Sequence, residues 1–316
     1  WLCPFISAAS PALSGLKNWH ELATSRDFSR MFDTVQYTQW RALRESKHSR
    51  FLYLTMPRVL ARTPYTANDS APEHFAYNEF HNQINEPEPQ QLTWMNAAFL
   101  MGTVLARAFY ETGYFLTITG AGNGGKIDGL PYARFNNNDS NMSYSPVEAG
   151  INHIQESQLI SSGLLPLCHL KNTDSAVFFE ANSLHKIKTT DDIDAYSDLM
   201  TSQTLSFIMV SSFFAHHIMM MSRHKVYDYI EEESFGEWLS QWIVSYTLAD
   251  ADKTRASDLT EKPLHMYPLY EADIHVEEIM GMPGIYQAVL WLRPRLLMGK
   301  LTTAVKVIIR LPSLDH

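Results

Sequence analysis

An apolar segment, Leu205–Met221, limits most strongly what this chain can fold into. A helix that spans a bilayer needs about 20 apolar residues, and two adjacent histidines near the middle of this segment, His216 and His217, would be costly in lipid. A helix that is hydrophobic on all sides otherwise occurs in the core of a large protein. The segment therefore predicts a buried helix and no membrane insertion.

The composition agrees with a globular protein that has a sizeable core. The chain has 316 residues, of which 45% are hydrophobic and 19% are charged, and this length suffices for two domains. The formal net charge of −9, without a cluster of Lys and Arg, argues against nucleic acid as a partner. The two cysteines, Cys3 and Cys168, cannot form a disulfide framework and are typical of a reducing compartment.

Hydrophobic periodicity predicts a mixture of helices and short strands in most of the chain and only strands at its C-terminal end. Besides the apolar segment, we expect helices at Asp27–Glu45, at Thr93–Thr112, and at Asn152–Ser162 with Asn152 as N-cap. A further helix is expected to begin with a capping box formed by Ser234 and Glu237. We expect strands at Phe51–Leu54, Tyr114–Thr119, Ala272–Val276, Ile285–Arg293 and Thr303–Leu311. An acidic linker at Asp191–Asp198 marks the predicted boundary between a domain at 1–195 and a domain at 196–316.

A glycine-rich motif could be mistaken for a nucleotide site. Gly120, Gly122 and Gly125 form a GxGxxG pattern after a predicted strand. A dinucleotide site needs a helix to begin there, whereas the chain continues into Lys126–Pro131, which cannot begin one. We interpret the motif as a turn that needs positive φ angles, and we expect no cofactor.

Three histidines on the apolar helix and its continuation could suggest a metal. His217 and His224 are two helical turns apart, which is too far for one ion, and the HExxH pattern is absent. We therefore predict no metal and no catalytic residue. The alternative is a globular enzyme, such as a metal-dependent hydrolase that uses His216, His217 and His224.

The most informative motif lies within Trp40–Tyr65, which predicts a short helix, a strand, a Pro-Arg turn and an Arg-rich end. Its residues follow the order Leu-x-x-Pro-Arg-x-Leu-x-Arg-x-Pro-Tyr, namely Leu54, Pro57, Arg58, Leu60, Arg62, Pro64 and Tyr65. Further motifs follow in order along the chain: Leu92 to Ala98, Gly120 to Pro131, Pro146 with Glu148, Ala215 with His216, Gly281 to Tyr286, and Arg310 to Pro312. Together they resemble the large sheath subunit of the bacterial type VI secretion system, the TssC or VipB family.

The chain departs from this family in places. Leu205, Ser206 and Phe207 stand where the family has Leu-Pro-Tyr, and Ser212 stands where it has an Arg before the Ala-His pair. The departures suggest a divergent branch, such as that of an intracellular pathogen. Because family members have a long region before the residues that match Pro4 and Phe5, we expect this chain to be the later part of a longer protein.

The resemblance implies a fold, a function and partners. The implied fold is α+β, a mixed α/β sheath-protein fold whose C-terminal antiparallel sheet pairs with neighbouring subunits. The implied function is structural, in the bacterial cytoplasm: a sheath that contracts and propels an inner tube. The implied partners are a small sheath subunit (TssB/VipA-like), neighbouring copies, an inner-tube protein (Hcp-like), a baseplate and a sheath-recycling AAA+ unfoldase. A phage-tail-type sheath protein is a further alternative.

The resemblance also suggests roles for particular residues. The last strand, with Val305, Val307, Ile309 and Arg310, is expected to join subunits. The outward face of the Asn152–Ser162 helix, with His153, Gln155 and Glu156, is expected to contact the inner tube, while Ile151, Ile154, Leu159 and Ile160 pack inward. Arg58 and Arg62 are expected to stabilise the fold through carboxylate or carbonyl contacts, because the guanidinium group is a planar, bidentate donor.

Overall fold

The computed structural model describes residues 2–24, 31–65, 77, 79, 91–137, 140–187, 191–225, 232–248, 263–282, 285–296, 301 and 303–311, with only the backbone at 23–24, 133–137, 140–144, 224–225 and 232–233. The chain forms two compact units. The N-terminal unit contains residues 5–106 and 118–186, and the C-terminal unit contains residues 1–4, 107–117 and 187–316. The domain boundary predicted at residue 195 remains a prediction.

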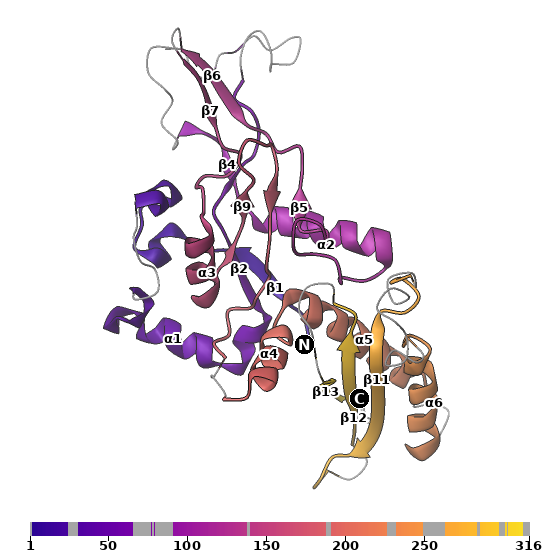
Figure 1. Ribbon diagram of the computed structural model, residues 1–316. Helices are drawn as coiled ribbons and strands as arrows, with labels where there is room; N and C mark the ends of the chain where they lie inside the picture. Colours follow the sequence, from indigo (N-terminus) through magenta and orange to yellow (C-terminus); the bar gives the residue numbers. More distant parts are fainter. Residues whose placement is uncertain are drawn as a thin grey trace. The chain divides into compact units, whose positions relative to one another are not determined.

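Small sheets form the framework of the N-terminal unit (Figure 1). A parallel sheet has the order β1-β2-β8, with β1 at Phe5–Ala8, β2 at Leu52–Met56 and β8 at Leu165–Pro166. An antiparallel sheet has the order β5-β10-β9, with strands Lys126–Ile127, Ala176–Val177 and Cys168–His169. Two antiparallel pairs complete the strands: β3 (Val59–Leu60) with β4 (Trp94–Met95), and β6 (Ala133–Asn137) with β7 (Ser140–Tyr144).

Strand β2 confirms the apolar strand expected at Phe51–Leu54, displaced toward Met56. Phe51 instead ends a 3-10 helix, Lys47–Phe51. Strand β2 lies in the middle of its sheet, so both of its edges are paired, and Tyr53 and Met56 are each 1% exposed. Met56 also belongs to a core cluster with Trp19 and Leu159.

The helix expected at Asp27–Glu45 is confirmed only in its C-terminal part. The α-helix α1 covers only Thr38–Glu45, and two short 3-10 helices, Met31–Asp33 and Val35–Tyr37, precede it. Residues 25–30 lie outside the described part of the chain. Thr34 stands between the two 3-10 helices with an extended backbone, which interrupts the α-helical hydrogen bonds.

Helix α2 covers Ala98–Thr112 and confirms the helix predicted there, except for its start. Trp94 and Met95 pair with β3, so the helix begins after them, and Asn96 rather than Thr93 accepts a hydrogen bond from the first-turn N–H of Ala98 (2.8 Å). The strand predicted at Tyr114–Thr119 is wrong. This stretch is irregular, and burial of Leu116 and Ile118, which lie in different units, outweighs its β propensity.

Helix α3, His153–Ser161, confirms the helix predicted between Asn152 and Ser162. A complete capping box is present at its start, since the side chains of Asn152 and Gln155 each accept the other residue's N–H. Gly163 follows the helix with a φ of 84°, as expected for a glycine terminator.

Among its described residues, the C-terminal unit has three complete helices, the end of α2 and one sheet. The helices are α4 (Ile193–Thr201), α5 (Leu205–Lys225) and α6 (Glu232–Val244). The sheet is antiparallel, with the order β11-β12-β13 and strands Leu269–Glu278, Tyr286–Pro294 and Val305–Arg310. The molecule is therefore α+β with a C-terminal antiparallel sheet, as predicted.

The core of the C-terminal unit lies between α5, α6 and one face of this sheet. It includes Phe214 and Ile218 of α5, Leu239 of α6, and Leu290 and Ile309 of the sheet, all at most 3% exposed. By length and composition alone, Leu205–Arg223 could also cross a membrane, but 61% of its most apolar window is buried inside the protein. The buried helix predicted at Leu205–Met221 is confirmed.

Two other predictions for this unit need correction. The segment Asp191–Asp198 is not a linker: Asp192 is the N-cap of α4, accepting the N–H groups of Asp194 and Ala195. Acidic residues at a helix start are favoured by the helix dipole, and the prediction overlooked this. Helix α6 begins by Glu232, so Ser234 lies inside it and is not its cap. Leu239 lies in the core, and Phe235, Trp238, Trp242 and Tyr246 are partly buried and pack against it.

Candidate assembly surfaces

Strand β13 is an edge of the C-terminal sheet. It pairs with β12 from Val305↔Leu292 to Arg310↔Gln287, and no strand lies on its other side among the described residues. The Leu311 N–H donates to Tyr286 O at 3.0 Å, in line with this register. Along an antiparallel pair, opposed residues whose backbone groups hydrogen-bond each other alternate with opposed residues whose backbone groups point away from each other. The backbone groups of Lys306, Ile308 and Arg310 therefore point to the open edge.

The side chains of β13 separate into an inner and an outer row. Val305 and Val307 are half-buried and Ile309 is 3% exposed, whereas Ile308 is 54% exposed and Arg310 is also exposed. Val307 and Ile309 pack in the core of their own unit. Of the four residues predicted to join subunits, only Arg310 offers its side chain at the surface. What the strand offers to a partner is chiefly its backbone edge.

Helix α3 presents a different face from the one predicted. Ile154 is 71% exposed, whereas Glu156 is 9% exposed, so the predicted orientation of these two residues is wrong. Gln155 is half-buried and fixed, because its amide also donates to Leu22 O at 3.2 Å. His153 is exposed beside Glu156 (Nδ1 to Oε2, 3.6 Å). The exposed surface of α3 is thus His153, Ile154, Ser157 and Ser161.

Glu156 faces the interior next to a thiol. Burial, and secondly the Glu156 carboxylate, raises the pKa of Cys168 to about 12. Cys168 is 4% exposed and free, so it is a buried side chain with little thiolate at neutral pH. Glu156 is thus largely shielded from solvent.

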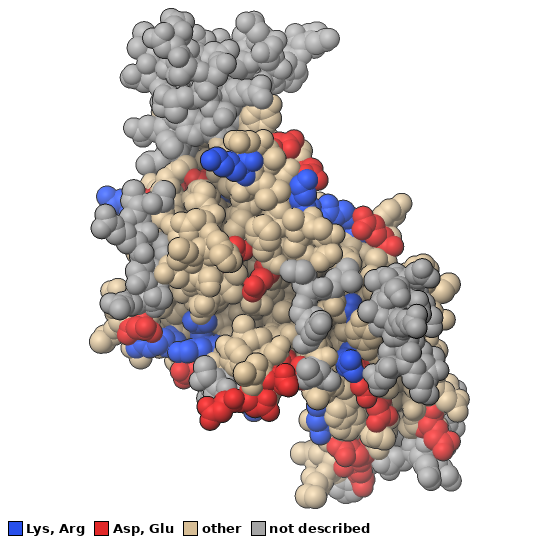
Figure 2. Space-filling model, in the orientation of Figure 1, with Lys and Arg blue, Asp and Glu red and all other residues tan. Residues whose placement is uncertain are grey.

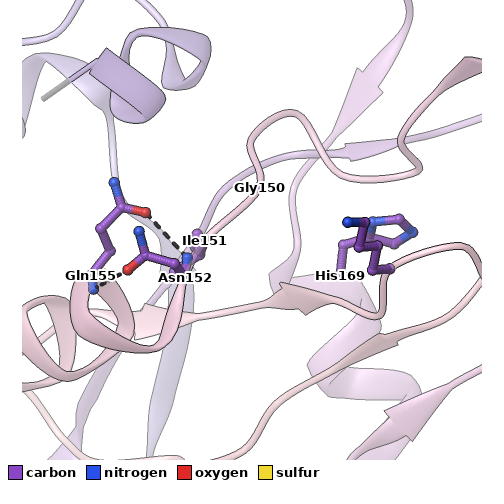
Figure 3. Close-up of a pocket in the computed structure, with 6 residues that line it drawn as sticks. Gly150, Ile151, Asn152, Gln155 and His169 are labelled. Carbon is purple, nitrogen blue, oxygen red and sulfur yellow. Dashed lines mark hydrogen bonds between the residues drawn. The ribbon is translucent and has the colours of Figure 1, made fainter.

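A shallow pocket of about 370 Å³ adjoins the start of α3 (Figure 3). Its lining includes Gly150, Asn152, Gln155, His169 and Lys171. Asn152 and Gln155 already hydrogen-bond each other's backbone in the capping box, and His169 Nε2 lies 2.8 Å from Thr173 O. The polar groups of this pocket are largely used within the protein.

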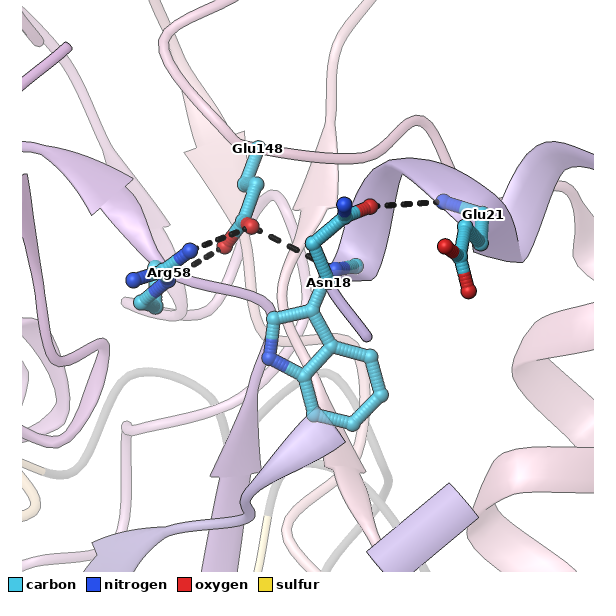
Figure 4. A network of polar contacts seen from close by, with 5 residues as sticks. Asn18, Glu21, Arg58 and Glu148 are labelled. Carbon is cyan, nitrogen blue, oxygen red and sulfur yellow. Dashed lines mark hydrogen bonds and ion pairs between the residues drawn. The ribbon is translucent and has the colours of Figure 1, made fainter. Parts of the chain in front are cut away.

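Arg58 forms a bidentate ion pair with Glu148 (Figure 4). Its Nε and Nη2 each lie 2.6 Å from a Glu148 oxygen, and the Glu148 side chain is 0% exposed. The hydrogen bond to Glu148 raises the pKa of Arg58. Trp19 adds its backbone N–H to Glu148 Oε1 at 3.3 Å. The pair joins segments that are far apart in sequence.

Arg62 forms a second bidentate pair, with Glu79, at 2.7 and 3.0 Å. Its guanidinium also lies 4.1 Å from the ring centroid of Tyr65, whose N–H donates to Glu79. The hydrogen bond from Arg62 lowers the pKa of Glu79. The sequence predicted carboxylate or carbonyl partners for both arginines but did not identify the two glutamates, because pairing over 17 or 90 positions leaves no local signal. A structural role for either arginine stays a prediction.

The motifs considered for enzyme chemistry have other roles in the fold. Gly120 and Gly124 have positive φ angles, and a Cβ on Gly125 would collide with Phe178 O and Gly120 N, so the glycine-rich segment is a tight turn, as predicted. His216 and His217 are exposed, and the His217 ring lies against Phe213. The side chain of His224 lies outside the described residues, among which no three His, Cys, Asp or Glu residues are placed to hold a metal.

Charged side chains are interspersed on the visible surface. Figure 2 shows Lys and Arg next to Asp and Glu among uncharged residues, and the described residues on this face form no broad basic area. An electrostatic footprint for nucleic acid would need such an area.

Comparison with known proteins agrees with these features. The profile of the EvpB/VC_A0108 tail sheath N-terminal domain matches residues 1–185, and that of the EvpB/VC_A0108 tail sheath gpW/gp25-like domain matches residues 194–311. The chain is 36% identical over 311 residues to the type VI secretion system sheath protein TssC1 of Pseudomonas aeruginosa. The match covers 98% of this chain and 61% of the length of that relative. This chain therefore belongs to the EvpB/VC_A0108 (VipB) family of tail sheath proteins.

Proposed function

We propose that this chain serves as the large subunit of a type VI secretion contractile sheath. Pairs of this subunit with a small sheath subunit would stack into a helical tube around an inner tube in the bacterial cytoplasm. Contraction of the tube would drive the inner tube outward. Membership of the tail sheath family supports this function, which is structural rather than enzymatic. The geometry that best supports it is the open edge of β13.

An open strand edge suits assembly into a filament. Each backbone hydrogen bond contributes only about 1 kcal/mol net, but several in series tether one subunit to the next. Because the contact would join the edge of one subunit to a different segment of another, it is heterologous, and heterologous contacts build an open helical filament whenever the rotation between subunits does not close a ring. An edge left open in a free subunit would be an aggregation hazard, which a partner strand removes.

Proline scanning of β13 tests the edge directly. Ile308→Pro removes an N–H that points to the open edge, so the isolated protein should fold normally. Val307→Pro removes an N–H that faces β12 and is the matched control, which should lower stability. After co-expression with the small sheath subunit, electron microscopy should show tubes for the wild type and none for Ile308→Pro. Normal tubes from a folded Ile308→Pro protein would refute the role of this edge.

The exposed surface of α3 is our candidate for the contact with the inner tube. It carries His153, Ile154, Ser157 and Ser161 and no exposed Lys, Arg, Asp or Glu, so the attachment would be weak and insensitive to salt. Weak attachment fits a sheath that must release its tube when it contracts. A baseplate and a recycling AAA+ unfoldase are further proposed partners, for which the described residues offer no particular surface.

A further inference from the structure

A buried carboxylate of α4 holds the residue that leads into β13. Asp198 is 9% exposed, and its Oδ2 accepts both the N–H of Thr303 at 3.1 Å and the hydroxyl of Thr303 at 2.7 Å. Thr303 stands two residues before the first paired residue, Val305. Charge-assisted hydrogen bonds of this kind are about twice as strong as neutral ones. The contact lies within the C-terminal unit, between its first helix and its last strand.

The hydrophobic pattern of β13 does not exclude every incorrect pairing register with β12. The contact between Asp198 and Thr303 can exclude one that remains. A slip of one residue would turn Val307 and Ile309 out of the core, so it is strongly disfavoured. A slip of two residues keeps the alternation. If Ile309 moves to the position of Leu311, the positions of Val307, Ile309 and Leu311 are all filled by other apolar residues, whereas the opposite slip would place Ser313 at the core position of Leu311. The first slip would move the strand about 7 Å along its neighbour. Packing alone therefore discriminates poorly between the native register and this slipped one.

The carboxylate does discriminate between them. After a two-residue slip, either Leu301 or Val305 would replace Thr303 opposite Asp198, and neither carries a hydroxyl group. The buried Oδ2 would then lose its hydroxyl donor, which is unfavourable for a shielded charge. Buried polar groups that fix the register of neighbouring segments are known in coiled coils.

We propose that Asp198 is a positioning residue that fixes the register of β13, and thereby sets where the open edge meets a neighbouring subunit. The second half of this inference rests on the proposed sheath function. The first half concerns the isolated chain and is independent of assembly. A strand displaced by two residues would present its outward backbone groups in a shifted position, so a subunit with a slipped β13 would not fit its neighbour.

Cysteine pairs report the register in the unassembled, full-length protein, with Cys3 replaced by serine. Gln287→Cys with Arg310→Cys is the native pair, since these residues face each other without mutual hydrogen bonds, at a separation of about 4.5 Å between Cα atoms. Gln287→Cys with Ile308→Cys is the slipped pair, which should oxidise poorly in the wild type. Asp198→Ala should raise the yield of the slipped disulfide about tenfold.

Matched variants separate this role from general destabilisation. Asp194→Ala removes an exposed carboxylate of the same helix and should leave both yields unchanged. Thr303→Val, which lacks only the hydroxyl, should give an intermediate yield, and Thr303→Ser should behave as the wild type. If Asp198→Ala does not fold, the yield of the slipped disulfide in Thr303→Val tests the proposal instead. Folded variants with the wild-type ratio of native to slipped disulfide would overturn the proposal. If the register changes but wild-type chains form no tubes, the sheath function fails and the positioning role stands.

Discussion

Glu148 is a carboxylate whose side chain is completely shielded from solvent, and such a group must be compensated. Arg58 supplies two hydrogen bonds and a positive charge, and the Trp19 N–H supplies a third donor. The Arg58 side chain is 42% exposed, so solvent screens part of the attraction. Loss of the pair would be unfavourable mainly because of Glu148, whose carboxylate is buried and would not be solvated if Arg58 were removed.

Removal of Arg58 should therefore destabilise the protein more than removal of Arg62. Arg58→Ala leaves Glu148 buried without its cation, and we expect a loss of about 2 kcal/mol in the free energy of unfolding, after discounting for the exposure of the arginine. Arg62→Ala breaks a pair near the surface and should cost less than about 1 kcal/mol. Urea unfolding curves measure both values. Equal losses for the two variants would contradict this difference.

Helix α3 is a short element that is fixed at both ends. Its start is closed by the capping box, and near its end Ser161 O accepts a hydrogen bond from Arg44 Nη2 at 2.8 Å. Arg44 is 8% exposed and also donates to Leu184 O, and burial lowers its pKa. A helix of nine residues would be marginal alone, so these contacts, together with the buried Leu159, hold its outer surface in place.

The exposed surface of α3 predicts which substitutions affect the inner tube. Ile154→Glu places a charge on a side chain that is 71% exposed, so the melting temperature should be unchanged. If α3 contacts the tube, extended sheaths around tubes should become rare and secretion of the inner-tube protein should fall. Ile193→Glu, at an isoleucine of α4 that is 83% exposed, is the matched control. Full secretion from the Ile154→Glu strain would rule out this contact.

Elements with a local signal were predictable from sequence, and the others were not. Asn152 and Gln155 lie three residues apart, so the capping box of α3 could be recognised before the fold was known. The orientation of Glu156 could not be predicted, because it involves Cys168, which lies on strand β9. The same holds for Asp198 and Thr303, whose contact spans 105 positions. Asp192 did carry a local signal, as an N-cap, but the acidic run was interpreted as a linker.

At the scale of the whole molecule, the cores do not follow the order of the chain. The core of the C-terminal unit includes Tyr114 and Leu116, which come from the middle of the sequence, and Leu2 packs against it. Tyr114 lies 5.3 Å from Phe213 and 6.1 Å from Phe214 between ring centroids. A C-terminal fragment that begins after residue 195 would lack Leu2, Tyr114 and Leu116. Folding of the C-terminal sheet should therefore depend on a segment more than 70 residues before that predicted boundary.

Tyr114→Ala tests this dependence. Tyr114 is 7% exposed, and removal of a buried aromatic ring leaves a cavity, so we expect a loss of about 3 kcal/mol in stability. Hydrogen exchange should accelerate in α5 and in β11–β13, and change little in β1 and β2, because opening follows cooperative units. Tyr110→Ala is the matched control, since Tyr110 lies four residues earlier, in the last turn of α2, and is 91% exposed. Equal acceleration in both units would show that they unfold as one, and unchanged exchange in α5 would show that Tyr114 does not support the C-terminal core.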